Sequence, residues 1–198
     1  MNASHEIGAE DPLELFDRWL GEAQRAEPND PNAAALATAT PEGAPSVRMV
    51  LVKSVMPERF CFFTNAESQK GRELRVNRRA ALCFHWKSLR RQVRVEGAVH
   101  ELEAPVVDAY FHSRSRASQI GAAISDQSRI LKSREELEAR LRQFMEVTQG
   151  EVPRPAFWRG FRLEPERIEF WISGADRLHD RFLFTRRDEE WGRVRLFP

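Results

Sequence analysis

The sequence lacks the features of secreted, membrane-spanning and disulfide-stabilised proteins. It contains only two cysteines, Cys61 and Cys83, which lie in separate apolar runs and form no Cys-x-x-Cys pair. We therefore expect reduced core thiols rather than a disulfide framework or a zinc site. No apolar run approaches the roughly 20 residues that span a bilayer, and residues 1–10 lack the basic and apolar regions of a signal peptide. These absences predict a cytoplasmic protein.

The sequence also lacks an excess of charge of either sign. It has 31 lysines and arginines against 30 aspartates and glutamates, which gives a net charge of +1. No nucleic-acid or membrane partner is therefore expected, and any anion must be bound locally. Because only Lys53, Lys70, Lys87 and Lys132 are lysine, arginine is abundant, and a single arginine is weak evidence for a site.

Several catalytic motifs are missing as well. There is no Gly-x-Gly-x-x-Gly, no Walker loop, no His-Glu-x-x-His and no Gly-x-Ser-x-Gly. Dinucleotide-fold dehydrogenases, P-loop enzymes, zincins and α/β-hydrolases are therefore disfavoured. The five histidines are not spaced as a metal-binding pair, so we predict no metal site.

The composition is that of one globular domain. A chain of 198 residues is long enough for one well-buried domain and short for two. Its 41% of hydrophobic and 31% of charged residues are typical of an ordered protein. We find no internal repeat, low-complexity tract or linker. A single domain over residues 1–198 is expected, with residues 1–10 as a flexible tail.

The hydrophobic pattern predicts strands, then a helical block, then strands. Asp11 and Pro12 begin an amphipathic helix that ends near Ala26, in which Leu13, Phe16, Leu20 and Ala23 recur at helical spacing, joined by Trp19. A short helix should cover residues 68–76, with Ser68 as its cap, and a helical block residues 104–148, with breaks near 113–118 and 125–133. Strands are predicted at 33–40, 47–54, 60–64, 80–86, 92–102, 158–163, 167–172, 181–185 and 191–196. This order predicts an α+β fold that is mainly β, an antiparallel β-barrel with packed helices.

Two groups of residues have the chemistry of phosphate ligands. Arg48 and Lys53 bracket one predicted strand, Thr64 ends the next, and Ser68 and Lys70 begin the short helix, whose N–H groups and dipole also favour an anion. Tyr110, Arg114 and Ser118 are spaced four and four, which predicts that they share one helical face. Two groups suggest two phosphorylated ligands, although a solvated helix face with one arginine would look much the same.

A third candidate is the cluster Arg177-Leu178-His179-Asp180-Arg181, close to Phe170-Trp171. Arginine offers a planar fork for phosphate or carboxylate, and histidine exchanges a proton near neutral pH. The cluster therefore suits the rim of a site for an anionic substrate that exchanges a proton or hydride. The alternative is an arginine-rich strand end with a surface ion pair.

In sequence, these segments resemble the pyridoxamine 5′-phosphate oxidase family, over residues 11–198. The pieces that carry the resemblance are Arg48-Met49-Val50-Leu51-Val52-Lys53, Phe63-Thr64-Asn65, Arg91-Gln92-Val93-Arg94-Val95-Glu96-Gly97, Tyr110-Phe111-His112-Ser113-Arg114, Ser118-Gln119-Ile120-Gly121-Ala122, Gln127-Ser128, Gly150-Glu151-Val152-Pro153, Glu169-Phe170-Trp171, Arg177-Leu178-His179-Asp180-Arg181 and Arg195-Leu196-Phe197-Pro198. Each piece is weak evidence, but the ordered set is specific.

The resemblance implies an FMN-binding split barrel that works as a homodimer, with the flavin at the subunit interface. It implies an oxidase of vitamin B6 biosynthesis that makes pyridoxal 5′-phosphate from pyridoxamine or pyridoxine 5′-phosphate. In that reaction a hydride passes from the C4′ carbon to flavin N5, and dioxygen then reoxidises the flavin and yields hydrogen peroxide. The redox chemistry is carried out by FMN, and the protein contributes positioning and electrostatics.

The resemblance also implies roles for individual residues. The implied FMN ligands are Arg48, Met49, Val50, Leu51, Val52, Lys53, Phe63, Thr64, Gln69, Lys70, Gln127 and Ser128, with Gln92, Trp171 and Arg181 at the ring system. The implied substrate-phosphate ligands are Lys53, Tyr110, Arg114 and Ser118. Arg177 and His179 would close over the pyridine ring as the catalytic pair, with His179 the candidate general base.

Three positions depart from the family pattern. Gln69 stands where an arginine is usual, Ser115 stands where a proline is usual, and residues 1–10 do not match the family's lid segment. Two other functions stay open: a flavin or deazaflavin reductase on the same barrel, and a non-catalytic pyridoxal phosphate carrier. The combination of Tyr110, Arg114, Arg177 and His179 disfavours the first, and Gln92, Trp171 and Arg181 disfavour the second.

Overall fold

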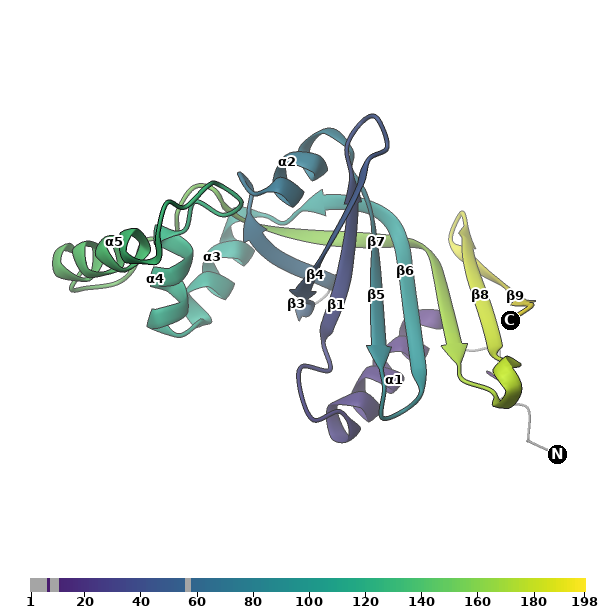
Figure 1. The fold of residues 1–198 in the computed structure, drawn as a ribbon. Helices are drawn as coiled ribbons and strands as arrows, with labels where there is room; N and C mark the ends of the chain where they lie inside the picture. Colours follow the sequence, from purple (N-terminus) through teal and green to yellow (C-terminus); the bar gives the residue numbers. More distant parts are fainter. Residues whose placement is uncertain (1–6, 8–10, 56–57) are drawn as a thin grey trace.

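The chain folds as one curled antiparallel sheet with helices at its end and on its inner face (Figure 1). The computed structural model describes residues 7, 11–55 and 58–198. In chain order the elements are α1 (Pro12–Ala26), β1 (Ala33–Ala39), β2 (Pro45–Leu51), β3 (Lys53–Val55), β4 (Glu58–Asn65), α2 (Gln69–Val76), β5 (Arg79–Trp86), β6 (Arg91–Glu101), α3 (Ala104–Ser113), α4 (Arg116–Ile124), α5 (Arg134–Val147), β7 (Trp158–Ile172), the 3-10 turn η1 (Ala175–Arg177), β8 (Asp180–Arg187) and β9 (Glu190–Leu196).

The strand order shows how the sheet curls. It runs β2-β1-β5-β6-β7-β4-β3, with β8 paired to β7 and β9 paired to β8. Strands β2 and β3 occupy opposite ends of this order, yet only Val52 separates them in the chain. The sheet must therefore bend round until its two ends meet, which is the geometry of a barrel. The predicted antiparallel β-barrel with packed helices is confirmed.

The prediction of one strand over residues 47–54 is wrong. Ala33, the first residue of β1, is paired with Leu51, and the N–H of Val52 donates to Asn32 O at 2.9 Å just beyond the end of that strand. The chain therefore leaves β1 at Leu51 and pairs with β4 from Lys53 onward. Conversely, the two strands predicted at 158–163 and 167–172 are one long strand, β7.

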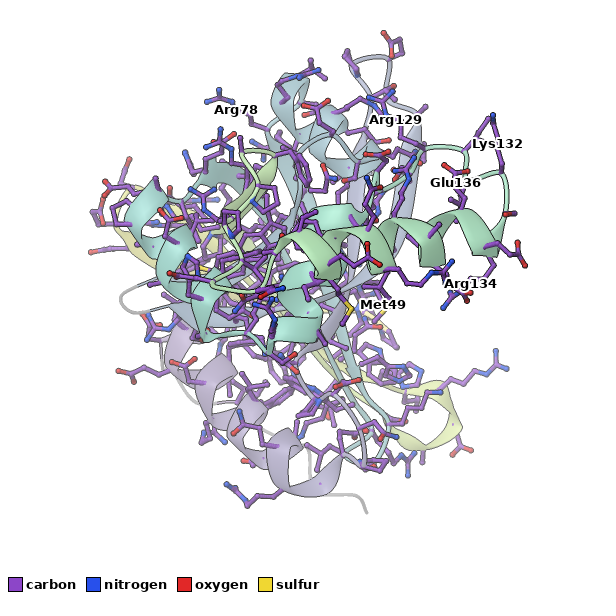
Figure 2. The ribbon with its side chains drawn as sticks, turned by 90° about the vertical axis from the view of Figure 1, so that its left-hand side faces the viewer. Met49, Arg78, Arg129, Lys132, Arg134 and Glu136 are labelled. Atoms are coloured by element: carbon purple, nitrogen blue, oxygen red, sulfur yellow. The ribbon has the colours of Figure 1, made fainter. Side chains whose placement is uncertain are left out.

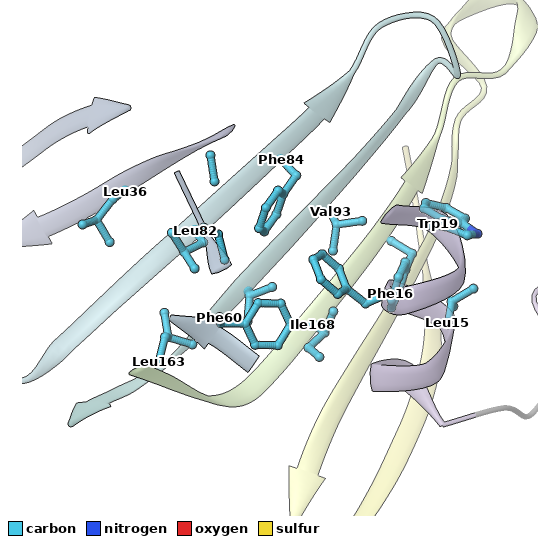
Figure 3. Packing of buried hydrophobic residues seen from close by; sticks show 14 of the residues in the cluster. Leu15, Phe16, Trp19, Leu36, Phe60, Leu82, Phe84, Val93, Leu163 and Ile168 are labelled. Atoms are coloured by element: carbon cyan, nitrogen blue, oxygen red, sulfur yellow. The ribbon is translucent and has the colours of Figure 1, made fainter. Parts of the chain in front are cut away.

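Helix α1 closes the inner face of the sheet (Figure 3). Asp11 Oδ1 accepts the N–H of Leu13 at 2.7 Å, which confirms the predicted cap. The ring of Phe16 lies 4.7 Å from that of Phe60 and 5.1 Å from that of Phe84. The buried stripe is Leu15, Phe16, Trp19 and Ala23, so the predicted stripe was partly misplaced: Leu13 and Leu20 are only half-buried. Each large apolar side chain buried here contributes roughly 1.5–3 kcal/mol.

Helices α3, α4 and α5 gather at one end of the barrel, around a second small core. This core contains Val107, Phe111, Ile120, Val152 and Trp158. Figure 2 views the molecule from this helical end and shows Arg129, Lys132, Arg134 and Glu136 around the start of α5. Helix α5 itself has no fully buried residue among those described, so the predicted apolar face of this helix is only partly covered.

The described residues bear on the predictions about cysteines, membrane spans and metal sites. Cys61 is buried, but Cys83 is only half-buried and lies on the outer face of β5 rather than in the core. Over residues 7, 11–55 and 58–198, no helix has the length and apolar character needed to cross a bilayer. The same residues contain no group of three or more His, Cys, Asp or Glu side chains that could hold a metal ion.

Candidate functional site

One cleft at the helical end of the barrel is lined by four of the eight predicted phosphate ligands, Thr64, Lys70, Tyr110 and Arg114. The cleft has a volume of about 250 Å³ and opens between β2, β4, α2 and α3. Its lining residues are Met49, Val50, Leu51, Phe63, Thr64, Lys70, Tyr110, Arg114, Gln127 and Trp158. All of them except Trp158 were predicted from the sequence to bind cofactor or substrate. The cleft therefore brings the two predicted phosphate groups side by side.

A buried lysine lies at the centre of the cofactor side. Lys70 is 7% exposed, and its Nζ donates to Thr64 Oγ1 at 3.2 Å, Ser68 Oγ at 3.3 Å and Gln127 Oε1 at 3.2 Å. Burial, and secondly the nearby charge of Arg48, lowers the pKa of Lys70 from its usual value. All three of these acceptors are neutral, so a bound anion would stabilise the ammonium.

Helix α2 places Lys70 by a cap that the sequence predicted. Ser68 Oγ accepts the N–H of Gly71 at 3.3 Å and thereby begins the helix. Gly71 is required because an added Cβ would lie 2.3 Å from Ala66 O. Ser128 lies against the same helix end: its Oγ accepts the N–H of Gln69 at 3.2 Å. Ser128 has a φ of +70°, a conformation that costs energy in a residue other than glycine and clusters at functional sites.

Arg48 is held by a buried carboxylate that sequence reasoning missed. Glu73 is 6% exposed and accepts hydrogen bonds from Thr38, from Ser46 at 2.7 Å and from Gln69 Nε2 at 2.9 Å. Its Oε2 lies 3.6 Å from Arg48 Nη2. Burial alone would raise the pKa of Glu73, but these hydrogen bonds and the Arg48 charge lower it overall. The i,i+4 spacing of Gln69 and Glu73 was the available signal.

The prediction that Tyr110, Arg114 and Ser118 share one helical face is wrong. Tyr110 belongs to α3, Arg114 follows the end of that helix in an extended conformation, and Ser118 lies in the first turn of α4. The break has a clear cause: Ser115 Oγ accepts the N–H of Ser118 at 3.3 Å and caps α4. Ser118 and Ser115 hydroxyls are 2.9 Å apart. The two helices nevertheless bring Tyr110 and Arg114 into the cleft.

Arg114 rests on an aromatic stack. The rings of Tyr110 and Phe63 lie 3.9 Å apart, and those of Phe63 and Trp158 5.3 Å apart. Arg114 Cζ lies 5.0 Å from the centroid of Trp158, a cation–π distance. Trp158 was predicted only as a strand residue, because nothing in its local sequence distinguishes a ring that lines a cleft from a core ring.

The Arg114 guanidinium is partly desolvated and incompletely paired. Its Nη1 is buried and has no hydrogen-bond partner in the described part of the chain. Burial lowers the pKa of Arg114 and raises that of Tyr110, each opposed by the charge of the other. A buried donor without a partner is costly, so this nitrogen is suited to an anionic ligand.

A second cluster lies on the outer face of β6, β7 and β8. Trp171 is directly opposite Gln92 on one side and Arg181 on the other. Residues directly opposite each other share a face of the sheet, so the three side chains predicted to contact the flavin ring form one row. Cross-strand pairing thus joins residues that are far apart in the sequence.

The predicted catalytic pair borders this row. Arg177 ends the turn η1, where Asp176 and Arg177 have φ values of +52° and +63°. Gly174 allows the chain to turn so tightly, because an added Cβ would lie 1.7 Å from Leu178 O. His179 Nδ1 accepts the N–H of Gly174 at 3.2 Å, and its ring lies 4.5 Å from that of Trp171.

Within one chain the two clusters do not meet. Figure 1 shows α3 and α4 at one end of the sheet, and η1 and β8 at the other. Lys53 also lies apart from the cleft, in a cavity of about 350 Å³ beside α1. Val52 is buried in the main core. The structure therefore groups the candidate residues into a phosphate-ligand cleft and a separate ring-side row.

The chain is similar to known proteins over nearly its whole length. A family model described as "Pyridoxamine 5′-phosphate oxidase" matches residues 20–148, and one described as "Pyridoxine 5′-phosphate oxidase C-terminal dimerisation region" matches residues 158–198. A pyridoxine/pyridoxamine 5′-phosphate oxidase of Erythrobacter litoralis is 59% identical over 184 residues, which cover 92% of this chain and 87% of that protein.

Two solved structures share the fold. PhzG from Burkholderia lata, in complex with tetrahydrophenazine-1-carboxylic acid, superposes with a TM-score of 0.90 at 32% identity and covers 100% of both chains. A pyridoxamine 5′-phosphate oxidase-related, FMN binding protein from Nostoc punctiforme has a TM-score of 0.77 at 17% identity, over 96% of this chain and 100% of that one. The expected FMN-binding split barrel is confirmed.

Proposed function

The chain belongs to the pyridoxamine 5′-phosphate oxidase family, and from this membership we propose that it oxidises pyridoxamine and pyridoxine 5′-phosphates to pyridoxal 5′-phosphate. It is an FMN-dependent oxidoreductase. We further propose dioxygen as the electron acceptor and hydrogen peroxide as the product. The observation that carries the proposal is that one cleft is lined both by the buried ammonium of Lys70 and by Arg114, whose guanidinium is partly desolvated.

The residues of the cleft fit FMN. Lys70 offers a desolvated ammonium whose hydrogen-bond acceptors are all neutral, and Ser128 holds a strained conformation at the start of the same helix. The phosphate and ribityl chain would be held by Arg48, Thr64, Lys70, Gln127 and Ser128, with Phe63 and Gln69 beside them, and the flavin would be lined by residues 49–53. When bound, FMN would supply the hydride acceptor, and these residues would fix its position relative to the substrate carbon.

The other side of the cleft fits the substrate phosphate. Arg114 Nη1 has no partner among the described residues, and a phosphate oxygen would satisfy it with a charge-assisted hydrogen bond. Tyr110 adds a side chain to the cleft lining, whereas Ser118 of α4 belongs to the proposed set through the family pattern. The Trp158 ring packs against the Arg114 guanidinium in a cation–π contact. Lys53 is part of the proposed set through the family pattern rather than through the cleft.

The working unit proposed here is a homodimer that joins the two clusters across its interface. The chain contains the family's C-terminal dimerisation region. Strand β2 exposes Val47, Met49 and Leu51 in a row, with exposed fractions of 68%, 64% and 48%, and contiguous apolar surface of this kind marks an interface. Arg177, His179, Gln92, Trp171 and Arg181 of one chain would then complete the cleft of its partner.

His179 is better suited to donate a hydrogen bond than to act as a general base. Its Nδ1 accepts the N–H of Gly174, so in the neutral imidazole the proton is on Nε2. The Nε2–H would then be available as a donor to the substrate. Arg177 supplies a second cationic donor from the strained turn. We propose that both residues hold the pyridine ring against the flavin.

The proposed function is tested by flavin extraction, light scattering and oxygen uptake. The purified protein should be a yellow homodimer that consumes oxygen when pyridoxamine 5′-phosphate is added. A colourless monomer that does not bind added FMN would contradict the proposed function. Binding of pyridoxal phosphate without oxygen uptake would indicate a carrier, and flavin reduction by a nicotinamide cofactor alone would indicate a reductase.

A first prediction concerns Gln69, where the family usually has arginine. Gln69→Arg should tighten FMN binding by about fivefold, on the order of 1 kcal/mol, because charge-assisted hydrogen bonds are about twice as strong as neutral ones. To reach the phosphate, the new guanidinium must leave Glu73, which is the present hydrogen-bond partner of Gln69. Titration of the apoprotein with FMN measures the change, and the gain should shrink at high salt.

Val76→Arg is the matched control, since it adds the same charge to the exposed last turn of α2. It should change the FMN dissociation constant little. Equal tightening in both variants would mean that the effect is general electrostatics. Unchanged or weaker binding in Gln69→Arg would show that this side chain stays with Glu73 and points away from the phosphate.

A further inference from the structure

A buried carboxylate beside the ring-side row has no part in the function described so far. Glu169 lies on β7, two residues before Trp171 and on the same face of the sheet. Its side chain is 4% exposed, although glutamate is rarely buried unless it is paired. A buried charge of this kind in a functional region calls for a specific role.

The contacts of Glu169 are directed at Arg181. Its Oε1 accepts a hydrogen bond from Arg181 Nε at 2.8 Å, and this bond raises the pKa of Arg181. Arg181 Nη1 donates to Phe197 O at 2.9 Å. Two of the three guanidinium nitrogens therefore have fixed protein partners, and because the group is planar, its orientation is determined.

A second arginine limits the freedom of the carboxylate. Arg94 is directly opposite Glu169 on β6, and its Nη1 lies 3.6 Å from Glu169 Oε2. Arg94 Nη2 also pairs with Glu96 at 2.6 Å. Glu169 thus lies between two cations, Arg94 and Arg181. It is directly beside the row of Gln92, Trp171 and Arg181.

We propose that Glu169 is a positioning residue that orients Arg181 against the flavin ring and partly offsets its positive charge, and so sets the reduction potential of bound FMN. The inference rests on the proposed function, because it requires the ring to lie against this row. A buried negative charge disfavours the addition of electrons nearby, so removal of the charge should make reduction of the flavin easier.

The test is the midpoint potential of bound FMN in Glu169→Gln. Glutamine keeps an oxygen that can accept from Arg181 Nε but removes the charge. We expect the equilibrium constant for flavin reduction to rise about tenfold, which equals ~30 mV for a two-electron couple. The dissociation constant of FMN should change by much less than this tenfold factor. Spectroelectrochemical titration of the holoenzyme gives the potential without any turnover assay.

Glu96→Gln is the matched control. Glu96 lies on the same face and pairs with Arg94 and Arg167, at 2.6 and 3.3 Å, but not with Arg181. The midpoint potential of FMN bound to Glu96→Gln should stay at the wild-type value. An unchanged potential in Glu169→Gln, or an equal rise in Glu96→Gln, would overturn the inference.

A second variant separates position from charge and serves if Glu169→Gln yields no folded dimer. Glu169→Asp keeps the charge but shortens the reach toward Arg181. The visible circular dichroism of bound FMN should change in this variant and stay the same in Glu96→Asp. Identical spectra in both would contradict the inference. A wild-type chain that binds no FMN would instead refute the proposed function, so the two failures are distinguishable.

Discussion

Replacing Arg114 by alanine should weaken binding of the phosphorylated substrate by about ten- to a hundredfold, while FMN content stays nearly unchanged. A charge-assisted hydrogen bond to phosphate contributes roughly 1.5 to 3 kcal/mol. Arg114 Nη1 is buried without a partner, and the guanidinium is held on Trp158, so little ordering is needed when the phosphate binds. The Michaelis constant and the extracted flavin measure the two effects.

Arg142→Ala is the matched control, because this arginine is exposed on α5, outside the cleft. It should leave both quantities at their wild-type values. If Arg114→Ala instead loses its flavin while the Michaelis constant for the substrate is unchanged, our assignment of the two phosphate sites is reversed.

Arg177→Ala and His179→Ala should each slow reduction of the flavin by substrate about ten- to a hundredfold, and FMN affinity should change much less. Each change removes a donor that holds the pyridine ring, and misplaced reactants lose rate steeply. Donors to charged groups contribute about 1.5–3 kcal/mol. Anaerobic stopped-flow mixing with saturating substrate gives the reduction rate directly.

Leu178 provides the control for this turn. It lies between the two residues and is 72% exposed, so Leu178→Ala should reduce flavin at the wild-type rate. If the Arg177 and His179 variants also react at that rate, the cluster is a solvated strand end, which was the alternative interpretation of the sequence.

Elements that depend on local signals could be predicted from the sequence. The caps Asp11 and Ser68 place α1 and α2 correctly because a side-chain oxygen and the first N–H groups of a helix are neighbours in the chain. The interruption at Val52 could not be predicted in this way. It depends on where β1 begins, since Ala33 pairs with Leu51 and Asn32 lies opposite Val52 just beyond that strand.

The candidate site shows the same division. Thr64, Lys70, Tyr110, Arg114 and Gln127 were predicted, and the fold brings them together, although their individual roles stay predictions. The wrong helical face arose because a spacing of four has meaning only within an uninterrupted helix, and Ser115 starts a new one. Glu73, Trp158 and Glu169 were missed, since their importance comes from partners on other elements.

In each chain the cleft lies apart from the ring-side row, so the proposed dimer, and not the chain, would be the unit on which a mutation acts. In the proposed assembly, a chain with a damaged cleft still lends an intact row to its partner, and the converse also holds. A mixed dimer of two such defective chains has one site that combines both lesions and one site with neither. Two inactive alleles, one in each cluster, would therefore complement each other, whereas two alleles within the same cluster would not.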